Sequence, residues 1–166
     1  MLRTDKGLSL VELMIIVIIV GVLTLIAVPN FIAFMQRYRL TTTAQSVYYH
    51  LQYARSEAVK RDTTVYISFQ TGDNWCYGLN TGSACNCATP SSCNLGTYTP
   101  PDSQLTTLSL SSGFTGFYFE GSRGAASATG TITITVTNGT ASMGIDVGSV
   151  GNLQMCSTNI SGYPTC

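Results

Sequence analysis

The sequence predicts an α+β protein in which a long N-terminal helix packs on an antiparallel, β-rich head with disulfide-tied loops. Three observations predict this fold. An almost wholly apolar run covers residues 8–28 and continues, past a proline, into an amphipathic helical pattern that ends at residue 61. From residue 62 the pattern changes to a period of two, which is typical of strands. All six cysteines lie in that second part.

The apolar run at residues 8–28 is long enough to cross a bilayer core, which takes about 20 helical residues. It carries a single charge, Glu12. A carboxylate in such a run costs about 2.5–3.5 kcal/mol on insertion scales, so its presence indicates a function. A cleaved secretory signal has a shorter apolar region and a small-residue cleavage site, neither of which is found here. A simple membrane anchor would leave Glu12 unexplained.

The start of the run has a distinctive motif at residues 6–13, which read KGLSLVEL. This motif resembles the type III signal of type IV pilins and type II secretion pseudopilins. The resemblance implies that a prepilin peptidase cleaves between Gly7 and Leu8, that the new N-terminus at Leu8 is methylated, and that Glu12 is the fifth mature residue. Pro29 falls where such pilins often have a helix-weakening proline. The one departure is Leu8, where the family usually has phenylalanine.

The resemblance also gives Glu12 a role in assembly. A subunit that enters a filament brings the freed amino group of Leu8 into an apolar bundle, where an unpaired charge is very unfavourable. Glu12 of a neighbouring subunit can compensate that amine. The implied partners are other pilins or pseudopilins through the N-terminal helix, the prepilin peptidase, and the inner membrane before assembly. The implied location is the bacterial inner membrane, with one span and a periplasmic head, and then a pilus or pseudopilus.

Four parts are expected along the chain: a leader at residues 1–7, a transmembrane and filament-core helix at 8–29, an amphipathic helix at 30–61, and a globular head at 62–166. Pro29 should kink the helix, because proline removes a backbone donor. Beyond it, small and aliphatic residues recur at helical spacing and form one apolar stripe that needs a sheet to cover it: Leu40, Ala44, Val47, Leu51, Ala54 and Ala58.

The head shows a series of strand patterns. Strands are expected at residues 64–69, 75–79, 105–110, 114–120, 131–137, 141–146 and 152–156. The first two should form a hairpin, and Asn138 with Gly139 supplies a tight turn for another. Residues 80–102 form a long loop rich in cysteine, glycine, proline and serine. Residues 121–130 are small and are expected to form an exposed, flexible loop.

The even number of cysteines on an exported face indicates disulfides. The residues concerned are Cys76, Cys85, Cys87, Cys93, Cys156 and Cys166. Six cysteines allow 15 pairings, of which those with Cys156–Cys166 are favoured because this bond closes a short loop. A Cys85–Cys87 bond is disfavoured because so tight a ring strains disulfide geometry. A zinc site is the alternative, but paired C-x-x-C spacing is missing, so no metal is predicted.

A second resemblance lies at the end of the helix. Residues 51–61 read LQYARSEAVKR and precede a strand and a hairpin that contains Trp75. This stretch is similar to the GspH/FimT branch of the pilin family, which implies a helix packed on antiparallel sheets and a low-copy role. From the residues alone, the charged side chains of this stretch form a solvated helix face with weak pairing: Arg55, Glu57, Lys60 and Arg61.

The sequence favours a filament subunit over an enzyme. It contains no G-x-S-x-G, HExxH or P-loop motif, and its single histidine, His50, lies within the helix, where a structural role is the more common one. No catalytic residue and no cofactor are therefore predicted. The expected function is that of a minor type IV pilin that primes assembly or lies near the tip and supports pilus biogenesis, twitching motility or DNA uptake. The alternatives are a GspH-like pseudopilin of type II secretion and a DNA receptor for transformation.

DNA binding by the isolated head is not expected. Some relatives in the FimT branch bind DNA through a tail resembling Gly-Arg-x-Arg, but the corresponding residues 151–156 read GNLQMC and carry no charge. From residue 62 onward, Arg123 is the only basic side chain against five acids. Phosphate contacts need lysine or arginine. Asn138 and Asn159 match glycosylation sequons, which are short patterns with many false positives. Adhesion through the cysteine loop is a further alternative.

Overall fold

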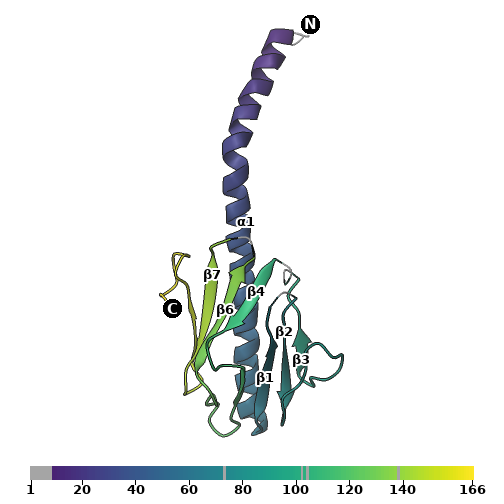
Figure 1. Cartoon of the computed structure of the whole chain (residues 1–166), viewed down its shortest axis with the longest axis vertical. Coiled ribbons are helices and arrows are strands. Elements are labelled where there is room, and N and C mark those ends of the chain that lie inside the picture. Colours follow the sequence, from purple (N-terminus) through teal and green to yellow (C-terminus); the bar gives the residue numbers. More distant parts are fainter. Residues whose placement is uncertain (1–8, 73, 102, 104, 138) are drawn as a thin grey trace, which may run out of the picture. The chain divides into compact units, whose positions relative to one another are not determined.

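The computed structural model describes residues 9–166 except 73, 102, 104 and 138, with the backbone alone for residues 26 and 29. The chain divides into two compact units, Met1–Gln36 and Arg37–Cys166. Helix α1 (Leu10–Arg61) begins in the first unit and continues as the helix of the second. Figure 1 shows that the strands all belong to the second unit, where both sheets lie on the same side of the helix.

The second unit contains two four-stranded antiparallel sheets (Figure 1). The first sheet has the order β3-β2-β1-β5 and is built from β1 (Val65–Gln70), β2 (Cys76–Thr81), β3 (Gly96–Tyr98) and β5 (Gly116–Phe119). The second sheet has the order β4-β6-β7-β8 and is built from β4 (Thr106–Leu110), β6 (Gly130–Val136), β7 (Ser142–Val147) and β8 (Leu153–Cys156). The predicted α+β fold and hairpin β1–β2 are confirmed.

The core lies between the helix and the inner faces of both sheets. The six helix residues predicted to form the apolar stripe are all completely buried. In the sheets, alternate residues point inward, so cross-strand partners such as Ile67 with Leu79 and Ile134 with Met143 share the core. Trp75 connects the sheets, because its buried indole N–H donates to the backbone oxygen of Thr106 at 3.0 Å. The core therefore consists of the residues that the helical spacing in α1 and the alternation in the strands place on the inward faces.

One expectation about loops was wrong, and a second was only partly right. The loop at residues 80–102 contains a short strand, β3, which pairs with β2 through only three residues. The loop at residues 121–130 is not freely exposed, because Gly121 and Gly124 are buried. A side chain on Gly121 would overlap the backbone of Asp62 and Thr63, so this loop packs directly on the end of α1. The glycines at these two positions reflect close packing, whereas Ser122 and Arg123 between them are exposed.

Candidate assembly interface

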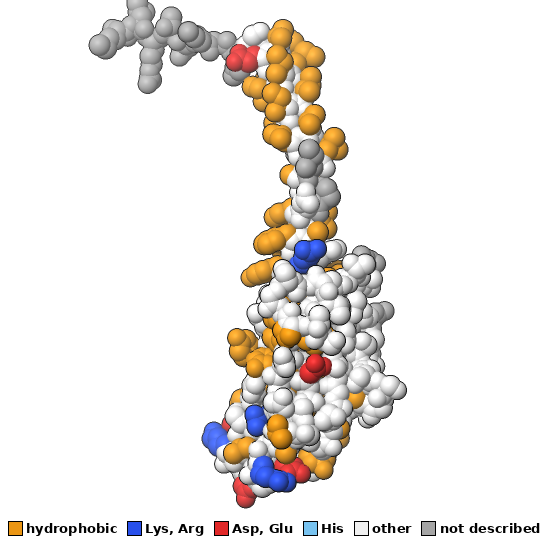
Figure 2. Space-filling model, turned by 90° about the vertical axis from the view of Figure 1, so that its left-hand side faces the viewer, with side chains coloured by type: hydrophobic (Ala, Val, Ile, Leu, Met, Phe, Trp, Pro, Cys, Tyr) orange, Lys and Arg blue, Asp and Glu red, His pale blue; other side chains and the backbone are white. Residues whose placement is uncertain are grey.

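The first unit exposes an apolar helix surface with one acidic side chain. The described large apolar side chains between Leu10 and Phe34 are 48–78% exposed. Figure 2 shows that hydrophobic side chains cover most of this segment on the face displayed. Glu12 lies in the first turn of α1 and is exposed. So much contiguous apolar surface is unfavourable in water, so another apolar phase or other subunits must cover it.

The span expected at residues 8–29 is only partly described. Gly7 and Leu8, the predicted cleavage and methylation residues, lie outside the described part of the chain. Within it, no single helix is long and apolar enough to cross a membrane, whereas the segments Leu10–Leu25 and Asn30–Arg61, taken together as a bent pair, have the required length and composition. Pro29 lies in the break between these segments, and its role as the cause of a kink remains a prediction.

All six cysteines are bonded in the second unit. The bonds are Cys76–Cys87, Cys85–Cys93 and Cys156–Cys166. The last is the bond that the sequence favoured, and the other four cysteines pair among themselves without the disfavoured Cys85–Cys87 bond. The first two bonds cross each other in sequence and fasten the loop between β2 and β3. Since every cysteine sulfur is in a disulfide, the zinc alternative loses its thiolate ligands.

Each sheet makes room for one disulfide by a glycine in a strand. A Cβ atom on Gly78 of β2 would overlap Cys93 Sγ and come within 2.8 Å of Cys85 Sγ. A Cβ atom on Gly144 of β7 would lie 2.7 Å from the sulfur atoms of both Cys156 and Cys166. Glycine inside a strand often marks such a close approach. These two glycines, each inside a strand, were a signal in the sequence for where the disulfides approach the sheets.

Arg55 joins the helix to both sheets, which contradicts the expectation that it lies on a solvated face. Its Nε donates to the carbonyl oxygen of Gly124, in the loop after β5, at 3.1 Å. Its Nη2 donates to the carbonyl oxygen of Val150, in the turn between β7 and β8, at 3.1 Å. The guanidinium carries several donors in a fixed geometry, which suits it to hold two carbonyls at once. Arg55 thus fixes one loop of each sheet on α1.

Glu57 is also more enclosed than expected, with only 8% of its side chain exposed. It accepts a hydrogen bond from Arg61 Nε at 2.6 Å and contacts Lys60 Nζ at 3.4 Å. The hydrogen bond from Arg61 holds the pKa of Glu57 below its usual range. Lys60 and Arg61 are themselves exposed, as the sequence indicated. The pairing is local to the helix end and positions no reactive group.

His50 has a structural environment. Its Nδ1 lies 2.6 Å from the hydroxyl oxygen of Tyr77, and its ring stacks on Tyr98 with centroids 3.7 Å apart. Burial lowers the pKa of His50 and raises the pKa of Tyr77. The imidazole and the phenol share this hydrogen bond, in which the tautomer of His50 decides whether Nδ1 donates or accepts. This arrangement fastens α1 to β2 and to the edge strand β3.

Acidification is expected to weaken the second unit through His50. In the unfolded chain His50 takes up a proton near its ordinary pKa of about 6.5, while burial resists that proton in the folded state. The stabilisation is complete above this pKa and declines as the pH falls through it toward the lowered folded value. Thermal unfolding between pH 8 and pH 5 checks this. A His50→Gln variant should show a smaller decline than the parent, and an equal decline would contradict the assignment.

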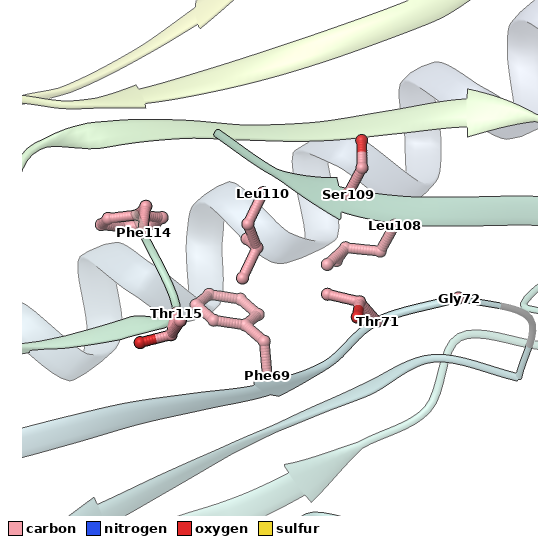
Figure 3. A pocket seen from close by; sticks show the side chains of 8 residues that line it. All are labelled: Phe69, Thr71, Gly72, Leu108, Ser109, Leu110, Phe114 and Thr115. Atoms are coloured by element: carbon pink, nitrogen blue, oxygen red, sulfur yellow. The ribbon is translucent and has the colours of Figure 1, made fainter. Parts of the chain in front are cut away.

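A pocket between the two sheets offers no chemistry for catalysis. Its volume is about 540 Å³, and Figure 3 shows aromatic and aliphatic side chains from the ends of β1 and β4 facing into it. The lining consists of Phe69, Thr71, Gly72, Leu108, Ser109, Leu110, Phe114 and Thr115. None of these side chains titrates in the physiological range. In the described part of the chain, no group of histidine, cysteine or acidic side chains could hold a metal.

The two glycosylation sequons have different outcomes. Asn138 lies outside the described residues. The Asn159 side-chain amide donates to the backbone oxygen of Thr140, and its oxygen accepts from the backbone N–H of Ser142 at 3.3 Å. Asn159 therefore holds the C-terminal loop against the β6–β7 connection. Its amide nitrogen, which a glycan would occupy, is already used in this contact.

The helix, the paired sheets and the exposed apolar segment together define a pilin-like filament subunit. The family model for "Type II transport protein GspH" matches residues 43–151. The chain therefore belongs to the GspH family, whose members are structural filament subunits and not enzymes. No curated protein sequence matches the chain significantly.

Two solved structures share the fold, and both are crystal structures of the type IV minor pilin FimU from Pseudomonas aeruginosa. The form in space group P65 is 20% identical, covers 70% of this chain and 91% of FimU, and has a TM-score of 0.55. The form in space group P21 is 22% identical, covers 74% of this chain and 91% of FimU, and has a TM-score of 0.56. These similarities establish the pilin fold that the sequence predicted.

Proposed function

We propose that the protein is a minor type IV pilin, a low-abundance subunit that primes filament assembly or lies near the tip. The observation that carries this proposal is the exposed apolar surface of the first unit with Glu12 in its first turn, in a chain of the GspH family. This surface would contact lipid while the subunit is in the membrane and would contact other subunits once it is in a filament. The proposed parts are a leader at residues 1–7, an assembly helix at 8–29, an amphipathic helix at 30–61 and a head at 62–166.

Glu12 is the proposed electrostatic contact in assembly. Cleavage after Gly7 creates a free amino group at Leu8, four residues before Glu12 in the sequence. In a filament, the carboxylate of one subunit meets the amine of its neighbour. A buried pair is far more favourable than two unpaired buried charges. A subunit out of register leaves both charges unpaired, so the same contact selects the correct register.

The apolar first unit and the disulfide-bonded second unit support a proposed location in the membrane and the periplasm. The apolar segment crosses the bacterial inner membrane once, the head folds in the periplasm, and the prepilin peptidase removes the leader at the cytoplasmic side. Three disulfides in the head fit an oxidising compartment. No cofactor is part of this function.

A role in type II secretion is the second candidate, and the description of the matching family model favours it. Deletion of the gene separates the two functions. For a minor pilin, we expect a loss of surface pili with normal protein secretion, measured on sheared filaments and culture supernatants. Loss of secreted proteins with normal pili would instead assign the chain to a pseudopilus. Restoration by the intact gene is the control for both measurements.

DNA binding by the isolated head has little electrostatic support. Its one basic side chain beyond residue 62, Arg123, lies 3.5 Å from the carboxylate of Glu120. Residues 151–156 form a turn and strand β8 without any charge. A non-specific DNA surface needs several cations in reach of phosphates. A contribution to DNA uptake would therefore run through the filament and not through this head as a receptor.

A further inference from the structure

The two disulfides beside β2 join cysteines that are not neighbours in the order of the chain. The first cysteine bonds to the third and the second to the fourth, as Cys76–Cys87 and Cys85–Cys93. The bond in the C-terminal loop, in contrast, joins the fifth cysteine to the sixth. The head therefore contains one crossed pair of bonds and one bond between consecutive cysteines.

The folded first sheet brings the crossed cysteines together. A Cβ atom on Gly78 of β2 would overlap Cys93 Sγ and lie 2.8 Å from Cys85 Sγ, so the bond between these sulfur atoms lies against the strand. The backbone N–H of Cys85 donates to Ser68 Oγ of β1 at 3.2 Å. Cys85 is thus placed by two neighbouring strands, which are paired with each other only after the sheet has formed.

Asn80 of β2 holds both ends of the cysteine loop without a covalent bond. Its Nδ2 donates to the carbonyl oxygen of Ser83 at 2.9 Å. Its Oδ1 accepts from the backbone N–H of Asn94 at 2.9 Å. These contacts place the second and fourth cysteines opposite each other. The information that selects the crossed pairing therefore lies in the folded sheet, and the unfolded chain does not have it.

The unfolded chain favours a different pairing. Cys76–Cys85 and Cys87–Cys93 bonds would each close a shorter loop than the native bond that they replace. Because the entropic cost of closing a loop rises with its length, these consecutive pairs form at least as readily as the crossed ones. An exported chain also presents its cysteines to the oxidising compartment in the order of the sequence. We therefore expect a dithiol oxidase of that compartment to form the consecutive pairs first.

We propose that the head is a substrate of a periplasmic disulfide isomerase, which converts the consecutive pairs into the crossed ones. This inference rests on the proposed location of the head and adds a partner that acts before assembly. A thiolate of the isomerase attacks Cys85 of the Cys76–Cys85 bond, which forms a mixed disulfide at Cys85 and frees the Cys76 thiolate. That thiolate attacks Cys87 of the Cys87–Cys93 bond and frees the Cys93 thiolate. The Cys93 thiolate then attacks Cys85 of the mixed disulfide and releases the isomerase. Each step breaks one S–S bond and forms one, so the exchange needs no oxidant and no reductant.

An external thiolate is required because a fully oxidised chain has none of its own. Only a thiolate attacks a disulfide, and three bonds use all six cysteines. In the folded head, Cys76, Cys87 and Cys93 are at most 8% exposed, so the finished crossed bonds are shielded from further attack. The isomerase therefore acts on the incompletely folded chain and no longer on the folded head.

The test produces the full-length chain in its host with and without the periplasmic disulfide isomerase. The yield of fully oxidised, protease-resistant head is measured in both strains. For the parent chain, we expect the yield without the isomerase to fall to about one third or less, because four cysteines allow three pairings and one of them is native. Two double variants each remove one crossed bond and leave only consecutive pairs, so their yields should be equal in the two strains: Cys76→Ser with Cys87→Ser, and Cys85→Ser with Cys93→Ser.

Removal of the C-terminal bond is the matched control. Cys156→Ser with Cys166→Ser also lacks one disulfide but keeps the crossing, so its yield should still depend on the isomerase. A trapping measurement on the parent chain keeps the proposal testable if the double variants fail to fold. An isomerase whose resolving cysteine is replaced by alanine should be recovered in a mixed disulfide with one of the four crossed cysteines.

Three results would each overturn the proposal. They are equal yields of the parent in the two strains, an equal loss in the variants that lack the crossing, and the absence of a mixed disulfide with the parent. A correctly oxidised head that does not enter filaments would instead refute the proposed function and leave this inference standing.

Discussion

Replacing Glu12 with valine is expected to leave the protein in the membrane and to lower its recovery in filaments about tenfold or more. The physical reason is that an uncompensated buried amine costs about 3–5 kcal/mol when its partner is removed. Valine suits the surrounding apolar run, so insertion itself should not suffer. Quantitative immunoblots of the membrane fraction and of sheared filaments measure the two pools separately.

Glu12→Asp is the matched control for this change. It keeps the carboxylate with a side chain shorter by one methylene group, so recovery should lie between that of the parent and that of Glu12→Val. Equal recovery of all three proteins would show that the charge has no part in assembly. Loss of Glu12→Val from the membrane would point to insertion, and not subunit pairing, as the step that needs the residue.

Gly151→Ala should be the most destabilising single-methyl change in the loops of the head. Gly151 has φ of +76°, and a Cβ atom there would overlap the carbonyl oxygen of Gly124 and lie 2.9 Å from Arg55 Nε. The left-handed backbone costs alanine about 1–2 kcal/mol, and the overlap adds about 1–3 kcal/mol. The overlap is with backbone, which no rotamer change can relieve. Chemical denaturation of the purified protein gives the loss in free energy of unfolding.

Gly82→Ala separates the cost of the left-handed backbone from the cost of the overlap. Gly82 has φ of +80°, but nothing lies within 4 Å of the Cβ position. Its substitution should therefore cost only the backbone term of about 1–2 kcal/mol. If both variants lose the same stability, the overlap with the carbonyl oxygen of Gly124 costs nothing, and the close packing of the two loops would be contradicted.

The strongest periodic patterns in the sequence predicted the fold. The buried helix stripe was predicted in full, because residues such as Leu40, Val47 and Leu51 repeat at helical spacing over several turns. The predicted strands were found with ends that differ by at most two residues, because alternation is clear in their middles and weak at their ends. The very short β3 had too few residues to show a pattern.

The contacts that fix the head could not be predicted from local sequence. Arg55 lies 69 and 95 residues from its two carbonyl partners, Gly124 and Val150, so nothing near it in the chain distinguishes it from a solvated arginine. Glu57 appeared solvent-facing for the same reason.

The N-terminus of the protein in purified filaments tests the central claim most directly. Mass spectrometry of that material should find a chain that begins at Leu8 and carries one methyl group, and a Gly7→Val variant should keep its leader and be missing from filaments. A filament protein that begins at Met1, or at a residue well beyond Val28, would contradict the claim that Glu12 pairs with a freed amine in a helical bundle.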